Sequence, residues 1–148
     1  FLCLDHVENP HNLGAIMRSA SHFGVCALIY RAKVPVALSP SAIRTSDGGA
    51  ESLPCYHVSS LDDVLNLAKI NHYSMIGTSS HKGKNLYEMN FKGRVILFMG
   101  AEKQGLCLKV LKKMNHSIMI PGTGMVESLN VSNATTAILS EWFRQFNH

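Results

Sequence analysis

Hydrophobic positions follow two patterns that alternate along the chain. Short apolar runs are bounded by Gly, Pro, Asn or Ser, and between them lie longer stretches whose apolar residues recur every three to four positions. The short runs are typical of buried strands, and the longer stretches are typical of amphipathic helices. Strands are predicted over residues 1–7, 25–30, 55–58, 73–78, 94–99 and 116–120. Helices are predicted over residues 13–23, 61–70 and 105–114, with a short one beginning at Ser39-Pro40-Ser41 and a last one capped by Ser128 or Asn130.

This alternation of strands and helices predicts an α/β fold, in which a mostly parallel sheet carries helices on both faces. A chain of 148 residues, 46% of them hydrophobic, is long and apolar enough for one packed domain over residues 1–148. Phe1 is not a start methionine, so we expect this domain to be part of a longer protein. No apolar stretch approaches the roughly 18 residues that cross a bilayer, so we expect no membrane association.

Charge and reactive side chains narrow the chemistry only slightly. The net charge of +4 allows a polyanionic partner without requiring one. The four cysteines are scattered and form no C-x-x-C pair, which is typical of free thiols in a reducing cytoplasm. The eight histidines lack the spacing of metal ligands, so we expect no metal site.

The first candidate site lies at the start of the helix predicted over residues 13–23. It reads Asn12-x-Gly14-x-x-x-Arg18, and on a helix Gly14 and Arg18 share a face one turn apart. The glycine would leave that face open, and an arginine above bare backbone suits the binding of a phosphate or another charged oxygen. A capped helix with one surface arginine explains the same residues.

Two further candidate segments follow strands. Gly100-Ala101-Glu102 comes directly after the strand predicted over residues 94–99, where ligands of open α/β sheets bind, and Gly100 would let a ligand approach the backbone. An ordinary strand-to-helix turn is the alternative. Residues 120–132 join a strand to a helix through Gly122 and Gly124, an arrangement that brings backbone amides to a ligand.

The glycines of this last segment match the dinucleotide-binding fingerprint only in part. Glu127 stands where the final glycine belongs, and no strand with a ribose-binding acid follows about 20 residues on. A nicotinamide-dependent oxidoreductase is therefore disfavoured, although it stays open as an alternative.

Together the three segments carry a resemblance to a known family. Asn12-x-Gly14-x-x-x-Arg18, Gly100-x-Glu102-x-x-Gly105-Leu106 and Ile120-Pro121 with Ser128-Leu129-Asn130-Val131-Ser132 occur in the order and spacing of motifs one, two and three of the SpoU/TrmH family. That family belongs to the SPOUT superfamily of RNA methyltransferases. Arg44-x-Ser46-x-Gly48-Gly49-Ala50 also resembles the family's loop before the third strand, so the match covers nearly the whole chain.

The resemblance implies a fold, a cofactor and an activity. The C-terminal part would be threaded into a deep trefoil knot, a rare exception to unknotted topology. The domain would bind S-adenosylmethionine, need no metal, form a homodimer and methylate a ribose 2′-OH of tRNA or rRNA. A cofactor-binding RNA-recognition module without turnover is the alternative within this fold.

The resemblance also assigns roles to individual residues. The residues matching the family's catalytic and supporting polar positions are Arg18, Asn12, Glu102, Ser128 and Asn130. The cofactor would lie against Thr78, Gly100, Ile120 and Leu129. The candidates for RNA contact are Arg18, Arg44, Lys82 and Lys84, the two lysines being equally explained as a solvated loop.

One of these roles needs a chemical qualification. The family's arginine is usually described as a general base, but arginine is essentially always protonated in proteins. We therefore expect Arg18 to bind the adjoining phosphate and to stabilise the developing alkoxide charge. Three residues depart from the family pattern: Lys103 in place of a glycine, Gly122 in place of a methionine, and Asp47, which adds negative charge to a loop that relatives use near RNA.

Overall fold

The computed structural model describes residues 1–35, 37, 39–101 and 104–146. The strands are β1 (Leu2–Asp5), β2 (Leu28–Arg31), β3 (Cys55–His57), β4 (Ser74–Thr78), β5 (Lys84–Asn85), β6 (Val95–Gly100) and β7 (His116–Met119). The helices are α1 (Pro10–His22), α2 (Pro40–Ser46), α3 (Gly49–Ser52), α4 (Asp62–Ile70), α5 (Leu108–Leu111) and α6 (Val131–Phe146), with a 3-10 turn η1 (Leu86–Glu88).

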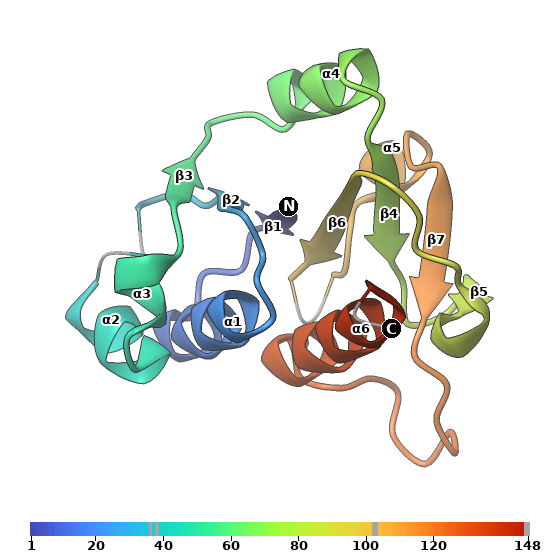
Figure 1. Cartoon of the computed structure of the whole chain (residues 1–148). Coiled ribbons are helices and arrows are strands. Elements are labelled where there is room, and N and C mark those ends of the chain that lie inside the picture. Colours follow the sequence, from blue (N-terminus) through green and yellow to red (C-terminus); the bar gives the residue numbers. More distant parts are fainter. Residues whose placement is uncertain (36, 38, 102–103, 147–148) are drawn as a thin grey trace.

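All seven strands form one sheet in the order β3-β2-β1-β6-β4-β7-β5, and the pairings between them are parallel. Helices α1 and α6 lie on one face of this sheet, and α4 and α5 lie on the other (Figure 1). The strands serve both layers because successive side chains point to opposite faces. Leu2 and Leu4 belong to the apolar cluster under α1 and α6, whereas Cys3 belongs to the cluster under α4. The predicted parallel sheet with helices on both faces is confirmed.

One local prediction was wrong, and two short elements were not predicted. The helix predicted over residues 105–114 spans only Leu108–Leu111, because Gly105 has a φ of +60° and its amide bonds back to the carbonyl of Ala101. The two elements that were not predicted are the short helix α3, which begins at Gly49, and the two-residue strand β5.

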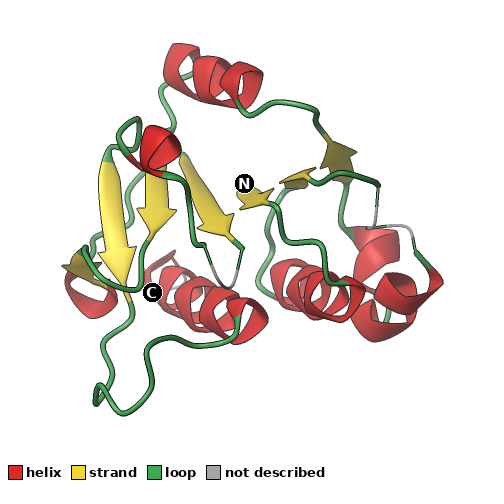
Figure 2. Ribbon diagram, turned by 180° about the vertical axis from the view of Figure 1, so that it is seen from behind, coloured by secondary structure: helices red, strands yellow, loops and turns green. Residues whose placement is uncertain are grey.

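The structure shows which of the two candidate residues, Ser128 or Asn130, caps the last helix. Asn130 is the N-cap of α6, since its Oδ1 accepts a hydrogen bond from the amide of Ser132 at 2.9 Å. The hydroxyl of Ser132 donates to the same oxygen at 2.6 Å. Asn130 therefore faces the helix it caps, and the preceding residues 121–130 form an exposed loop on the way to it, drawn in green in Figure 2.

Strand β7 occupies a place that its position in the chain does not suggest. It comes after β4 and β5 in sequence, yet it lies between them in the sheet. The connection over residues 79–83 crosses directly above it: a Cβ on Gly83 would lie 2.8 Å from the carbonyl carbon of Ile118. The hydroxyl of Ser117 donates to the carbonyl of Lys82 at 3.1 Å. The absence of a side chain at Gly83 is what lets the two backbones approach.

The end of α6 is tied to the segment that follows η1. The side-chain amide of Gln145 donates to the carbonyl of Met89 at 2.9 Å and accepts from the amide of Phe91 at 2.9 Å. The last helix is therefore fastened to a segment more than 50 positions earlier in the chain.

Candidate functional site

The carboxyl ends of three neighbouring strands meet at one edge of the sheet. Strands β6, β4 and β7 are adjacent and parallel, and in Figure 1 their arrowheads point the same way, towards α6. Gly100 and Thr78 close β6 and β4, and Ile120 directly follows β7. Ligands of open α/β sheets bind at such an edge. The structure thus brings three of the four predicted cofactor residues to one edge of the sheet.

The loop over residues 121–130 is exposed along its whole length and carries apolar side chains. Met125, Val126 and Leu129 are 88%, 73% and 48% exposed. A Cβ on Gly122 or Gly124 would meet nothing within 4 Å. Uncovered apolar side chains beside free space fit the flat apolar face of an adenine. This loop suits an adenosine-containing cofactor.

Gly100 has a different neighbour from the one the sequence suggested. A Cβ at Gly100 would overlap the backbone of Gly105 and Leu106. The chain after β6 turns back on the strand, and the amide of Gly105 donates to the carbonyl of Ala101 at 2.7 Å. The missing side chain therefore admits this returning loop, and contact between Gly100 and a cofactor stays a prediction. Glu102 and Lys103 lie outside the described residues.

The structure joins the first and third sequence motifs. The side-chain amide of Asn130 donates to Oδ1 of half-buried Asn12 at 3.1 Å. Beyond this contact, Ser19 of α1 and Thr136 of α6 share a hydrogen bond of 2.7 Å between their hydroxyls. Helices α1 and α6 thus run side by side from their first residues, and Ser128 lies in the exposed loop that leads to this junction.

The expected open face beside Gly14 is wrong. A Cβ on Gly14 would lie 2.5 Å from the carbonyl oxygen of Ala42 and 2.6 Å from Cβ of Thr45, so α2 packs directly on this glycine. Arg18, one turn on, forms an ion pair with Asp47, with 3.0 Å between its Nη2 and the carboxylate Oδ2. The glycine therefore sets how closely α2 approaches α1, and the helix pair places a carboxylate against Arg18.

The other basic candidates do not gather around Arg18. Arg44 is exposed on α2, which packs on α1. Lys82 and Lys84 are exposed in and after the connection that crosses β7, at the other end of the sheet (Figure 1). Thr78 and Lys84 pair with Ile118 of β7 from its two sides, so strand β7 separates them. Arg44 lies on the same face of the sheet as Arg18, on the helix that packs against α1.

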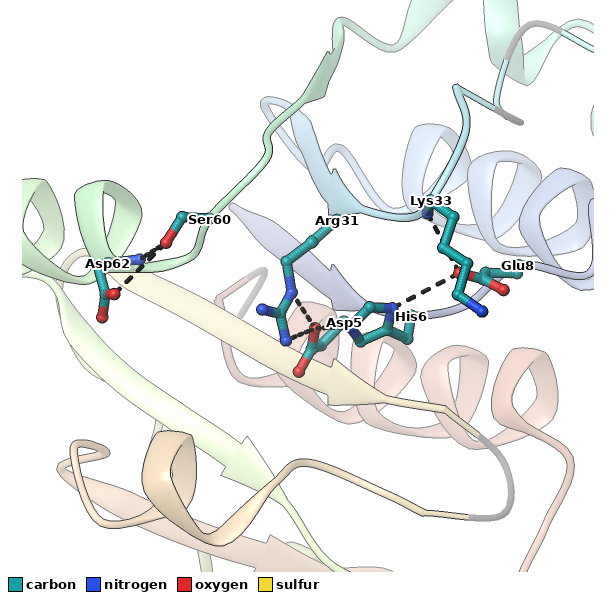
Figure 3. Close-up of polar contacts among 7 residues, drawn as sticks. All are labelled: Asp5, His6, Glu8, Arg31, Lys33, Ser60 and Asp62. Carbon is teal, nitrogen blue, oxygen red and sulfur yellow. Dashed lines mark hydrogen bonds and ion pairs between the residues drawn. The ribbon is translucent and has the colours of Figure 1, made fainter.

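Sequence reasoning missed a buried ion pair at the ends of β1 and β2. Asp5 is 4% exposed, and Nε and Nη2 of Arg31 each lie 2.7 Å from its Oδ1 (Figure 3). Asp5 is also the register partner of Gly100, so the pair adjoins the end of β6. The available signal was two opposite charges, each closing an apolar strand that runs parallel to its neighbour.

A second polar contact lies just beyond this pair. Glu8 accepts a hydrogen bond from the amide of Lys33 at 3.2 Å and lies 3.5 Å from the imidazole of His6 (Figure 3). These contacts, the backbone one first, lower the pKa of Glu8 below its usual value. They tie the loop after β1 to the loop after β2.

Two classes of site are not found within the described ranges. Residues 1–35, 37, 39–101 and 104–146 contain no group of three or more His, Cys, Asp or Glu side chains that could hold a metal ion. In the same part of the chain, every helix is too short or too polar to cross a bilayer.

Comparison with known proteins places the chain in a family. The model of the SpoU rRNA Methylase family matches residues 1–140. The chain belongs to this SpoU family. It is 37% identical over 144 residues to the uncharacterized tRNA/rRNA methyltransferase YfiF of Escherichia coli, covering 97% of this chain and 41% of that protein. It is 38% identical over 144 residues to the 23S rRNA (guanosine-2′-O-)-methyltransferase RlmB of Escherichia coli, covering 97% of this chain and 59% of that enzyme.

A solved structure of a SpoU methyltransferase has the same fold. AviRb from Streptomyces viridochromogenes, in complex with AdoMet, superposes with a TM-score of 0.91 at 30% sequence identity, covering 97% of this chain and 56% of AviRb. The SpoU domain described here thus spans about half the length of the proteins it matches.

Proposed function

We propose that this SpoU domain transfers a methyl group from S-adenosylmethionine to a ribose 2′-oxygen of tRNA or rRNA. The observation that carries the proposal is the exposed apolar loop over residues 121–130 at the edge where β4, β6 and β7 end. A similar fold holds AdoMet in AviRb, and RlmB is named for the same reaction on 23S rRNA.

Residues at the carboxyl ends of β4, β6 and β7, and in the loop over residues 121–130, would hold the cofactor. The cofactor supplies an activated methyl group on sulfur. Leu129 and Ile120 would provide apolar contact, and Thr78 and Gly100 would contribute from the neighbouring strands. Methyl transfer needs the ribose oxygen to be held in line with the methyl group. The bond from the methyl group to sulfur would break as the bond to oxygen forms, S-adenosylhomocysteine would leave, and the hydroxyl proton would pass to water, because Arg18 stays protonated. Asn12, Ser128 and Asn130 would orient the substrate, together with Glu102.

Arg18 would bind an RNA phosphate and stabilise the negative charge that develops on the attacking oxygen. Its guanidinium suits this role better than that of a base, because it stays protonated. A pH–rate profile of Arg18→Lys tests the choice: a new ionisation that controls the rate would favour the base role. Arg44, Lys82 and Lys84 would add phosphate contacts.

The proposal also includes a homodimer, a knotted chain and a location in the cell. A homodimer is supported by the aromatic end of α6, where Phe143 and Phe146 are 40% and 44% exposed. A trefoil knot is supported by the insertion of β7 between β4 and β5 and by the crossing at Gly83. A reducing cytoplasmic location is supported by four free cysteines. A monomer in sedimentation at micromolar concentration would count against the dimer.

Two measurements on the same preparation separate the candidate functions. Calorimetry with S-adenosylhomocysteine should show binding, and radiolabelled S-adenosylmethionine should transfer its methyl group to unmodified tRNA or rRNA. Binding without transfer to either RNA would favour a recognition module. Absence of binding at high micromolar concentration, with tight binding of a nicotinamide cofactor, would favour the oxidoreductase and sink the proposal.

A further inference from the structure

The ion pair between Arg18 and Asp47 places a carboxylate where the proposed function needs a phosphate. The two side chains are 63% and 67% exposed, and their charged atoms lie 3.0 Å apart. A carboxylate oxygen and a phosphate oxygen are both charged acceptors for the same guanidinium N–H groups. The Asp47 carboxylate and an RNA phosphate would therefore compete for Arg18.

The position of Asp47 is built into the backbone. Asp47 follows the last residue of α2 with a φ of +47°, a left-handed conformation that aspartate and asparagine tolerate better than most residues. Before it, Ser46 is fully buried, and its hydroxyl donates to the carbonyl of Ile43 at 2.7 Å and accepts from the amide of Ala50 at 3.1 Å. This turn therefore has a fixed shape.

The turn is also held against the helix that carries Arg18. A Cβ on Gly49 would lie 2.9 Å from Cα and N of Arg18, so α3 touches the backbone of α1 at Arg18 itself. One turn earlier, Gly14 gives α2 the same close approach. Backbone contacts on both sides of Asp47 thus hold its backbone beside that of Arg18, where its carboxylate lies within ion-pair distance of the guanidinium.

We propose that Asp47 is a specificity-determining residue that occupies Arg18 until an RNA phosphate displaces it. The inference rests on the proposed function, because it takes Arg18 as the phosphate ligand. An RNA that makes contacts elsewhere on the domain can displace the carboxylate from Arg18. An RNA that binds through its phosphate charge alone gains little affinity at Arg18, because the phosphate must first replace the carboxylate. Asp47 thereby lowers the affinity for non-substrate RNA.

The test uses Asp47→Asn and poly(U), a single-stranded RNA without a folded recognition site. Asparagine tolerates the same backbone conformation and removes only the charge. Fluorescence anisotropy across a salt series should show tighter binding of poly(U), with a slope of log K against log salt steeper by about 0.7, the contribution of one phosphate contact to a single strand. Unchanged affinity and slope would overturn the inference.

A matched control and a second background make the result specific. Asp62→Asn removes the same charge from an exposed ion pair with Lys113, on the other face of the sheet, and should leave poly(U) binding unchanged. In an Arg18→Gln background, Asp47→Asn should have no further effect. An equal increase in the affinity for poly(U) in that background would indicate general repulsion between Asp47 and RNA. It would contradict the proposal that an RNA phosphate displaces Asp47 from Arg18.

Failure of the proposed function gives a different pattern. If Arg18→Gln alone leaves both poly(U) binding and methyl transfer unchanged, Arg18 is not a phosphate ligand and both proposals fall. If Arg18→Gln weakens both while Asp47→Asn changes nothing, only the role of Asp47 falls. Thermal unfolding of each variant, with a midpoint close to that of the unmodified protein, ensures that folded proteins are compared.

Discussion

The side-chain amide of Asn130 donates a hydrogen bond to Oδ1 of Asn12 at 3.1 Å, across 118 positions of the chain. The same residue caps α6 through its oxygen. One side chain thus fixes the start of the last helix and links it to the start of α1.

Two substitutions of Asn130 separate these functions. Asn130→Ala removes the cap and should lower the free energy of unfolding by about 1 kcal/mol. Asn130→Asp keeps a capping oxygen, so its stability should stay within about 0.5 kcal/mol, but it loses the donor to Asn12. Methyl transfer should fall at least about tenfold in both. Full activity of Asn130→Asp would show that the link to Asn12 is not needed.

Gly14→Ala tests the contact between α1 and α2. The new methyl group would lie 2.5 Å from the carbonyl oxygen of Ala42, a backbone atom that cannot turn away. We expect a loss of about 1–3 kcal/mol in the free energy of unfolding, measured by urea titration. Gly122→Ala, whose methyl group meets nothing within 4 Å, is the control and should change stability by less than about 0.5 kcal/mol. Equal effects of the two substitutions would contradict the packing argument.

Arg31→Met tests the buried pair with Asp5. The substitution leaves a carboxylate that is 4% exposed without its guanidinium, at a cost of several kcal/mol for a fully buried pair. Because the Arg31 side chain is 27% exposed, we expect a smaller loss of about 2 kcal/mol. Lys113→Met breaks the exposed pair with Asp62 and should cost much less stability than Arg31→Met in the same urea titration.

Glu141 makes stability depend on pH. Hydrogen bonds from Arg144 and Gln145 lower the pKa of Glu141 to about 2. A carboxylate whose pKa is depressed by folding stabilises the protein above its unfolded pKa, and this contribution is lost as pH falls towards the folded value. Glu141→Gln should therefore be less stable than the unmodified protein at pH 7, and the gap should shrink between pH 4.5 and pH 2. A gap that is constant over this range in urea titrations would refute the prediction.

Leu129 tests the cofactor edge. It is 48% exposed, so Leu129→Ser should leave stability nearly unchanged, while the lost apolar contact should weaken S-adenosylhomocysteine binding about five- to tenfold. Leu108→Ser, at a side chain 75% exposed at the start of α5, is the control and should bind normally. Unchanged binding by Leu129→Ser in calorimetry would remove Leu129 from the cofactor contacts.

The sequence predicts the layers of this fold better than the contacts between them. Apolar runs such as the one ending in Asp5 suffice to identify a buried parallel strand, because both faces must be covered. The link between Asn12 and Asn130, and the packing of α2 on Gly14, depend on segments that meet only after folding. Residue type could single out Gly14 and Arg18 as notable, but it could not show that α2 fills the space beside the glycine or that Asp47 faces the arginine.

The sheet order also constrains how the chain can fold during its synthesis. Strand β1 is entirely buried, and its neighbour β6 begins more than 90 positions later, where the backbone nitrogen of Phe1 donates to the carbonyl of Val95 at 2.9 Å. Until residue 95 has emerged from the ribosome, β1 presents an apolar edge with unpaired backbone groups, the kind of edge that promotes aggregation. At about 5–20 residues per second, a nascent chain would spend several seconds in that state, and a chaperone that covers apolar strands would be most useful during this interval.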